Sequence, residues 1–378
     1  MRVIVLTLSP YITDPWTVSA DRLFDLTGGN TGNMAFQFAV LQHIASESRV
    51  MHLGASPSQL REAGDIIVMP LANQLGDHTD LGQMADKLEA AQLPVIGIGL
   101  GAQAPDQTQD IALSKGTERW VRTIAALSPT KGPNLGVRGD YTRQQLEKIG
   151  LGDSVVVTGC PSNFLAPHLD FLNSIDEKFA RPIQRIAVAA GIPHVTALAN
   201  LEADLAAMVT ATGGIYVVQH GIDMIRLGRG AFDAISPEAM ELHRNYIAPH
   251  LPTDAFKLWC RRFARAFTDV RQWMDELRQH DFAVGTRFHG AMLAVQAGTP
   301  AGCIAHDSRV YEMCQTMGIP VVLGSQIDTL SMSSLKRHFK WDSENYKKRR
   351  AELRSAYSHL LTSAGIKVSR RIAAETAR

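Results

Sequence analysis

Six residues in the last third of the chain carry side chains suited to binding and protonating an anion. They read Gly285-Thr286-Arg287-Phe288-His289-Gly290 and join an apolar strand pattern to an apolar helix pattern. In an extended chain Arg287 and His289 project to the same side. A guanidinium binds phosphate or carboxylate, an imidazole titrates near neutral pH, and helix-start amides favour an anion. The segment therefore predicts a phosphate or carboxylate site, with purely structural roles for both residues as the alternative.

A second segment, near the N-terminus, combines small residues with amides. It reads Gly28-Gly29-Asn30-Thr31-Gly32-Asn33 and runs directly into an apolar helix pattern. Glycine lets the backbone approach a ligand closely, and the free N–H groups at a helix start favour a polar oxygen. The alternative is an ordinary loop in which Asn30 or Asn33 caps the helix.

Two further segments follow predicted strands. Residues 94–103 end in Gly99-Leu100-Gly101-Ala102-Gln103, which contains G-x-G but lacks the third glycine of a dinucleotide fingerprint. We expect it to line a cleft. Arg138 ends the strand pattern 135–138, just before a helix start, where a guanidinium suits an anionic ligand. A surface ion pair is the alternative for Arg138. In 306–312, Asp307 is best explained as a helix N-cap.

These segments require a scaffold of strands followed by helices. Short β-branched runs alternate with helical patterns along the whole chain, which is typical of parallel α/β sheets. The predicted strands are 3–8, 50–53, 65–69, 95–98, 135–138, 155–158, 186–189, 215–218, 282–285, 302–305 and 321–323. The predicted helices are 33–45, 80–91, 118–127, 142–149, 198–210, 259–279, 291–297 and 310–317.

The pattern divides into two α/β units of similar size. We predict two Rossmann-like domains that face each other across a cleft. The first is residues 1–175, and the second is residues 176–335 and carries the Arg-x-His-Gly motif. A basic helical segment, 336–378, follows them. Ligands of open α/β sheets bind beyond the carboxyl ends of the strands, where the segments above lie. Residues 226–252 fit no element clearly and could be a lid over an acceptor or an ordinary insertion.

Composition excludes several classes of protein. Hydrophobic residues make up 45% of the 378 residues, charged residues 20%, and the formal net charge is +1. These values argue against a disordered chain and against a nucleic-acid binder held by bulk charge. No run approaches the ~18 apolar residues of a membrane span. The four cysteines show no C-x-x-C spacing, so we expect reduced thiols in a cytoplasmic protein without a bound metal.

The charged residues are unevenly distributed along the chain, although the formal net charge is only +1. From Lys336 onward there are 12 Lys+Arg and 4 Asp+Glu, a net charge of +8, so the first 335 residues carry +1 − 8 = −7. The densest run is Lys347-Lys348-Arg349-Arg350. This segment is either the solvated face of a C-terminal helix packed on the acidic first domain, or a basic surface facing anionic lipid at the inner face of a membrane.

Taken in order, these segments resemble the polysaccharide pyruvyl transferases. The strongest match begins at Gly285 and continues through Gly298, Asp307 and Arg309 to 318–320. Supporting matches are 30–33, 99–103 and 137–140, so the resemblance spans about residues 28–323. It implies a fold similar to GT-B glycosyltransferases, and transfer of a pyruvyl group from phosphoenolpyruvate to a sugar as a cyclic ketal.

The resemblance also implies roles for individual residues. It makes Arg287 and His289 catalytic and places Arg138, Arg287, His289, Gly290 and Gly101 at the donor. The acceptor would meet Asn30, Gly32, Asn33 and Gln103. The partners would be phosphoenolpyruvate, as substrate rather than cofactor, and a saccharide that a lipid could carry. No metal is required, and we propose His289 as the acid or as the cation that stabilises phosphate.

Two departures from the family pattern keep other functions open. Asn33 stands where the family usually has Asp, and residues 70–74 replace a loop that is often glycine-rich. One alternative is a GT-B-type glycosyltransferase that uses a nucleotide sugar, with Asp307 or Glu312 on a ribose and Arg287 on a pyrophosphate. The other is a non-catalytic paralogue that binds saccharide.

Overall fold

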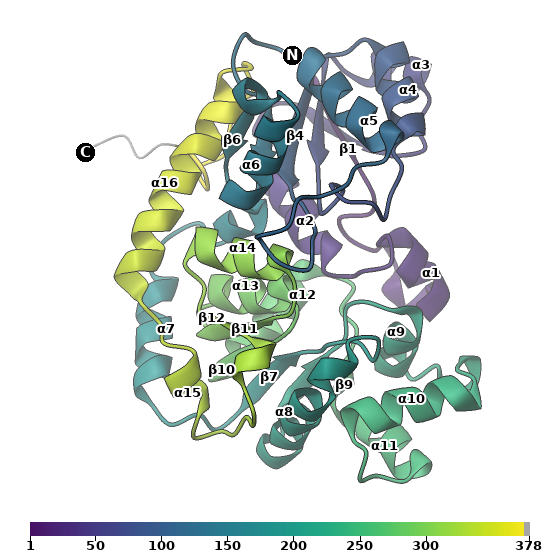
Figure 1. Ribbon diagram of the computed structural model, residues 1–378, viewed down its shortest axis with the longest axis vertical. Coiled ribbons are helices and arrows are strands. Elements are labelled where there is room, and N and C mark those ends of the chain that lie inside the picture. The colour runs from purple at the N-terminus through teal and green to yellow at the C-terminus, as the bar shows by residue number, and fades with distance from the viewer. Residues whose placement is uncertain (374–378) are drawn as a thin grey trace.

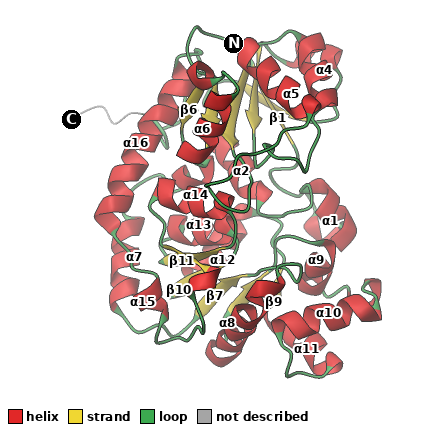
Figure 2. Ribbon diagram, in the orientation of Figure 1, coloured by secondary structure: helices red, strands yellow, loops and turns green. Residues whose placement is uncertain are grey.

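A computed structural model describes residues 1–373 of the protein. Figure 1 shows two α/β units, one above the other along the long axis of the molecule. Residues 374–378, the end of the predicted basic segment, lie outside the described residues. The chain forms two six-stranded parallel sheets flanked by helices (Figure 2). The predicted fold class, two Rossmann-like domains across a cleft in a GT-B-like arrangement, is therefore confirmed.

The first sheet has the strand order β2-β1-β3-β4-β5-β6. Its central strands are buried along their whole length, which explains why they read as continuous apolar runs rather than as alternating patterns. The strands are β1 (Val3–Thr7), β2 (Ser48–His52), β3 (Ile66–Pro70), β4 (Val95–Leu100), β5 (Leu135–Val137) and β6 (Val155–Val157).

The second sheet has the order β12-β11-β10-β7-β8-β9. Its strands are β7 (Ile186–Ala189), β8 (Ile215–Val217), β9 (Ala264–Arg265), β10 (Phe282–Gly285), β11 (Ala301–Ala305) and β12 (Val321–Leu323). Eleven of the twelve strands in the two sheets overlap a predicted strand; β9 does not.

Helices cover both sheets. In the first half they are α1 (Ala20–Leu26), α2 (Asn33–His43), α3 (Pro57–Ala63), α4 (Gly82–Ala91), α5 (Lys115–Ala126), α6 (Asp140–Lys148) and α7 (Phe171–Ala180). In the second half they are α8 (Ala199–Thr212), α9 (Ile222–Arg229), α10 (Pro237–Ile247), α11 (Thr253–Phe263), α12 (Val270–Arg278), α13 (Phe288–Gln296), α14 (Ser308–Met317), α15 (Leu335–His338) and α16 (Ser343–Thr362). Helix α7 runs across the predicted boundary between residues 175 and 176.

The predicted helix 259–279 is wrong. The chain leaves α11, pairs through β9 with β8, and starts a new helix, α12, where the Asp269 side chain accepts a hydrogen bond from the Arg271 amide at 2.7 Å. The residues before and after β9 have helical periodicity, so the sequence pattern does not indicate this two-residue strand. Residues 226–252, which had no assignment, form most of α9 and all of α10.

Each sheet reverses its strand order at one point. In the first sheet β1 lies between β2 and β3, and in the second β7 lies between β8 and β10. At such a reversal the flanking connections leave to opposite faces of the sheet and open a crevice beyond the carboxyl ends of the strands. The segments after β3 and β10 therefore occupy the positions where each domain can hold a ligand.

Two central helices separate the sheets. Every residue of α13 is buried, and seven of the eleven residues of α2 are buried, so both are apolar on almost every side. The ring of Phe36 on α2 lies 5.6 Å from the ring of His289 on α13. The N-terminal ends of both helices therefore meet between the domains.

The C-terminal helix α16 packs against both domains, as the left edge of Figure 1 shows. Tyr346 and Tyr357 are fully buried, and Arg350 donates hydrogen bonds to the carbonyl oxygens of Asn163 and Ala166 at 3.0 and 2.8 Å. The buried side of α16 therefore holds the basic segment against the two domains. Among residues 1–373, no helix has the length and apolar character needed to cross a membrane.

Candidate functional site

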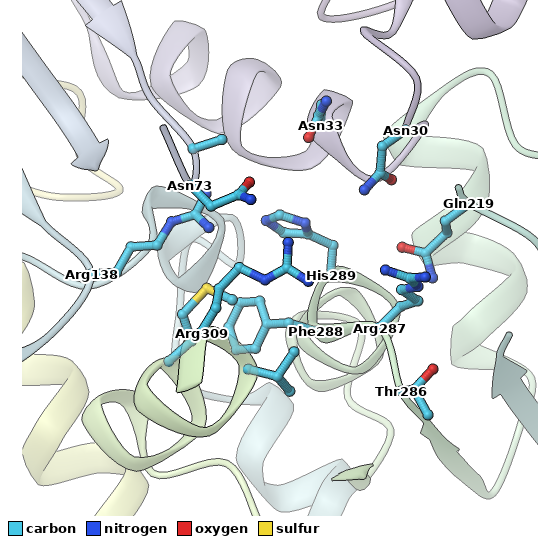
Figure 3. Close-up of a pocket in the computed structure, with 13 residues that line it drawn as sticks. Asn30, Asn33, Asn73, Arg138, Gln219, Thr286, Arg287, Phe288, His289 and Arg309 are labelled. Atoms are coloured by element: carbon cyan, nitrogen blue, oxygen red, sulfur yellow. The ribbon is translucent and has the colours of Figure 1, made fainter. Parts of the chain in front are cut away.

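A cleft lies between the two domains at the strand-order reversals. Its outer cavity has a volume of about 980 Å³, and a small inner pocket of about 30 Å³ opens from it. The two share Asn30, Asn33, Ala72, Asn73, Arg287 and Arg309. Arg138, Gln219 and His289 line only the inner pocket, where Figure 3 shows side chains from both domains pointing toward one another.

Arg138 reaches the inner pocket from the first domain. Its side chain is buried, its Nε donates to the carbonyl oxygen of Gly99 at 2.8 Å, and its guanidinium lies 5.8 Å from the centre of the Phe36 ring. A Cβ on Gly101 would come within 2.9 Å of Arg138 Cδ, so glycine there leaves room for the arginine. Backbone carbonyls, rather than a carboxylate, hold this cation in place.

Arg287 follows β10 in the second domain, and no carboxylate among residues 1–373 forms an ion pair with it. It is 8% exposed, and its Nε and Nη2 have no hydrogen-bond partner among residues 1–373. Burial, with the nearby charge of Arg309, lowers the pKa of its guanidinium to about 10. An unpaired buried cation is costly to the folded state, so its presence indicates a site for an anion.

Arg309 completes a set of three arginines. Its Nη2 lies 3.1 Å from an oxygen of Asp307, and its Nε is buried without a partner in the described part of the chain. The other oxygen of Asp307 accepts from the Val310 amide at 2.9 Å and caps α14. Asp307 is therefore an N-cap, as the sequence predicts, and it also orients Arg309 toward the inner pocket.

Three helix N-termini meet the same pocket. Helix α2 begins at Asn33, α13 at Phe288 and α14 at Ser308, each within two residues of side chains that line the inner pocket. Each N-terminus contributes partial positive charge and free amides. Together with the arginines they make a strongly electropositive site, which suits a small ligand with more than one negative group.

His289 lies among these cations. It is 8% exposed, and burial, reinforced by Arg138 and Arg309, lowers its pKa well below its ordinary value. The imidazole is therefore neutral in the ligand-free protein. Because bound anions would offset the two guanidinium charges, we expect ligand binding to make His289 more basic.

Three of the four predicted acceptor residues, Asn30, Asn33 and Gln103, border the cleft, whereas Gly32 lines neither cavity. Asn30 Oδ1 accepts from the Gly32 amide at 2.8 Å, and Asn33 Nδ2 donates to the carbonyl of Thr27 at 2.9 Å. Asn33 thus holds its own loop while its side chain borders the pocket. Gln103 lines the outer cavity and accepts a hydrogen bond from Asn73.

Three of the predicted glycines do not line the inner pocket. A Cβ on Gly32 would lie 2.8 Å from Gln219 Oε1 and 3.3 Å from His289 Nδ1. A Cβ on Gly290 would lie 2.6 Å from the Cβ of Ala189. Like Gly101, these residues allow close packing around the site rather than forming its surface.

Sequence reasoning missed several polar residues at the site. Asn73 and Gln219 follow β3 and β8, so the strand-end rule could have found them. The amide nitrogen Nε2 of Gln219 and the Thr286 hydroxyl are buried without partners among residues 1–373. Glu202, in the middle of α8, gave no signal, since its relation to the site arises only from packing.

Glu202 is a buried acidic residue near Arg287. One of its oxygens accepts hydrogen bonds from the Gly191 amide at 3.0 Å and the Tyr216 hydroxyl at 2.5 Å. Burial raises its pKa, while those two hydrogen bonds and the Arg287 charge oppose the rise. Glu202 is therefore an acidic residue close enough to Arg287 for the two groups to interact electrostatically.

Glu312 joins the two domains instead of facing the cleft. Both of its oxygens accept hydrogen bonds from Thr142 at the start of α6, from the amide at 2.7 Å and from the hydroxyl at 2.8 Å. A contact between Glu312 and a ribose, expected for a nucleotide-sugar enzyme, does not fit this arrangement.

The Glu312 contact gives a testable pH dependence. Burial raises its pKa from 4.5 to about 7. Between these two values the folded protein keeps a proton that the unfolded chain has lost, so stability falls as pH rises, by about 3 kcal/mol in total. Glutamine cannot ionise. We therefore expect the melting temperature of Glu312→Gln to fall less than that of wild type when the pH is raised from 5 to 8. Equal losses in the two proteins would contradict this role.

Comparison with known proteins places the chain in a family. The family model of the polysaccharide pyruvyl transferases matches residues 45–308, more than half of the chain. The chain belongs to the polysaccharide pyruvyl transferase family. The matched region of this pyruvyl transferase family member contains Arg138, Arg287 and His289 and leaves out Asn30 and Arg309. No curated protein matches the sequence.

Several solved structures are distantly similar to this family member. The S. aureus MnaA–UDP complex has 10% identity and a TM-score of 0.47, with 97% of each chain covered. A UDP-GlcNAc 2-epimerase from Methanocaldococcus jannaschii, in complex with UDP-GlcNAc and UDP, has 10% identity and a TM-score of 0.43, with 94% of this chain and 99% of that chain covered. Within residues 1–373, no three His, Cys, Asp or Glu side chains are grouped so as to hold a metal ion.

Proposed function

We propose that this protein transfers the pyruvyl group of phosphoenolpyruvate to a saccharide as a cyclic ketal. The observation that carries the proposal is the convergence of three arginines, three helix N-termini and one histidine on a single inner pocket. Phosphoenolpyruvate bears a carboxylate and a phosphate on a three-carbon frame. Its binding requires a concentrated positive potential supplied by groups that can form paired hydrogen bonds.

The size of the cavity suggests how the donor would bind. The inner pocket of about 30 Å³ has room for only about two water-sized groups. One anionic group of the donor would enter it and pair with Arg287, while the remainder would lie in the outer cavity of about 980 Å³. The same outer cavity, bordered by Asn33 and Gln103, would admit the saccharide.

The reaction balances without a cofactor. A proton is added to the methylene carbon of the donor, which becomes a methyl group, and C2 acquires oxocarbenium character. One saccharide hydroxyl bonds to C2 and loses its proton, the bond from C2 to the phosphate oxygen breaks, and a second hydroxyl closes the ring with loss of its proton. Arginines would stabilise the departing phosphate. His289 would donate a hydrogen bond or a proton to the donor.

A ligand panel tests the proposal. We expect phosphoenolpyruvate to raise the melting temperature of the protein and, with saccharide present, to yield inorganic phosphate. Pyruvate and inorganic phosphate serve as half-ligand controls and should stabilise it less. Stabilisation by nucleotide sugars alone would favour a glycosyltransferase instead. A response only to saccharide would favour a non-catalytic binding protein, and either result would contradict the proposal.

The exposed part of the basic segment leads to a proposal about where the acceptor is met. Lys347 and Lys348 on α16 are exposed, whereas Lys336 donates to the carbonyls of Phe179 and Arg181. We propose that the exposed lysines contact anionic lipid at the inner face of a membrane, where a lipid-linked saccharide could be presented.

Charge substitution is a sharper test of this contact than truncation, because α16 is part of the core. We expect Lys347→Gln with Lys348→Gln to reduce co-sedimentation with vesicles that contain anionic lipid, and Arg22→Gln on α1 to serve as an exposed control. Equal binding by the double variant and wild type would rule the contact out.

A further inference from the structure

A cysteine from the first domain lies directly behind the imidazole of His289. Cys160 follows β6, is fully buried, and places its Sγ 3.6 Å from His289 Nε2. This separation is within hydrogen-bond range for sulfur. The Ser162 hydroxyl lies 3.1 Å from the same sulfur and can donate to it. The two residues belong to different domains, so the contact exists only when the domains are assembled.

The other ring nitrogen of His289 has a different environment. A Cβ on Gly32 would lie 3.3 Å from His289 Nδ1, so this nitrogen faces the loop of residues 30–33 that borders the cleft. The hydrogen-bond contact of the ring to Cys160 is made through Nε2 and leaves Nδ1 on the side of that loop. One ring nitrogen thus faces a thiol in the protein interior, and the other faces the position of the ligand.

We infer that Cys160 is a positioning residue: its S–H donates to Nε2 and thereby keeps the ring proton of His289 on Nδ1, facing the cleft. A neutral imidazole carries one N–H donor and one acceptor, and a hydrogen bond to one nitrogen decides which. With the proton on Nδ1, His289 can donate a hydrogen bond to an anionic oxygen of the ligand. The tautomer rests on geometry alone, whereas its effect on turnover rests on the proposed function.

The charges around the ring favour a neutral imidazole. The ionisable groups that face His289 are Arg138 from the segment between β5 and α6, Arg309 from α14, and Cys160 itself. Burial and the two arginines disfavour an imidazolium, which leaves a neutral ring with one nitrogen free to accept a hydrogen bond. Because Cys160 is fully buried and does not line the inner pocket, its role is to orient His289 and not to attack substrate.

The tautomer can be observed directly by nuclear magnetic resonance. The intact protein would be labelled with ¹⁵N at its histidine rings, and the His289 signals identified by their loss in His289→Gln. Wild type and Cys160→Ser, whose hydroxyl also donates, should show a protonated Nδ1 and an unprotonated Nε2. Cys160→Ala should shift this equilibrium toward Nε2 protonation. Cys260→Ala, a buried cysteine on α11, is the matched control and should leave the tautomer unchanged.

Kinetics adds a second readout that a merely structural cysteine would not change. In Cys160→Ala we expect kcat for phosphate release to fall about tenfold, the scale of losing a group that orients a catalytic residue. KM should change little, and Cys160→Ser should restore most of kcat. An Nδ1-protonated ring in Cys160→Ala, or an Nε2-protonated ring in wild type, would overturn the inference. The expected tautomer with no turnover of phosphoenolpyruvate would uphold the positioning role and overturn the proposed function.

Discussion

Arg287→Met is expected to lower kcat/KM for phosphoenolpyruvate by at least ~10²–10³-fold, the effect of removing one preorganised group that stabilises transition-state charge. The same substitution should not destabilise the ligand-free protein. Arg287 Nε and Nη2 are buried without partners among residues 1–373, and methionine fills a similar volume without a charge. Loss of function with unchanged or raised stability is the signature of a group kept for its ligand.

Thermal unfolding with and without phosphoenolpyruvate, together with a phosphate-release assay, checks both parts of this prediction. Wild type should gain stability from the ligand and the variant should not. Arg122→Met provides the control, since Arg122 is an exposed arginine on α5 paired with Glu118 at 2.7 Å. A variant that still binds and turns over the donor would show that Arg287 lies outside the donor site.

His289→Gln is expected to reduce kcat for phosphate release by about 10²–10⁴-fold, the range for removing a positioned proton donor. Glutamine can keep a hydrogen bond but cannot transfer a proton, so binding of the donor should survive better than turnover. If the variant loses affinity and keeps its kcat, then His289 acts only in binding.

The same histidine also predicts the shape of the pH profile. Its pKa in the free enzyme lies well below 6.5 because of burial and the two neighbouring arginines. A plot of kcat/KM against pH should therefore show no fall that depends on His289 between pH 6 and 8. An inflection near 6.5 that disappears in His289→Gln would contradict the neutral imidazole assigned to the free enzyme.

The strands were the most predictable part of the fold, and the reason is burial on both faces. Strands such as β3 and β7 appear in the sequence as short unbroken apolar runs, and every residue in them is buried. Short helices were less predictable. Helix α1 matches no predicted element; it is short, it packs on α9, and Asp21 forms an ion pair with Arg226 at 2.5 Å.

The candidate site also contains residues that the sequence predicts and residues that it does not. Arg138, Arg287 and His289 were predictable because each ends a strand or starts a helix, where parallel sheets hold their ligands. The residues that interact with these side chains from behind, Cys160 and Glu202, were not predictable. Cys160 lies 129 positions before His289 in the sequence, and Glu202 lies within a helix pattern, so only the packed structure reveals what each one faces.

The central claim is that this inner pocket activates phosphoenolpyruvate for transfer of its pyruvyl carbons to a sugar. The most direct measurement is ¹³C nuclear magnetic resonance of the saccharide after reaction with phosphoenolpyruvate labelled at C2. We predict a labelled ketal carbon on the saccharide, equal in amount to the phosphate released and absent with Arg287→Met. Label found only in free pyruvate, or only in unreacted donor across a broad set of saccharide acceptors, would contradict the claim.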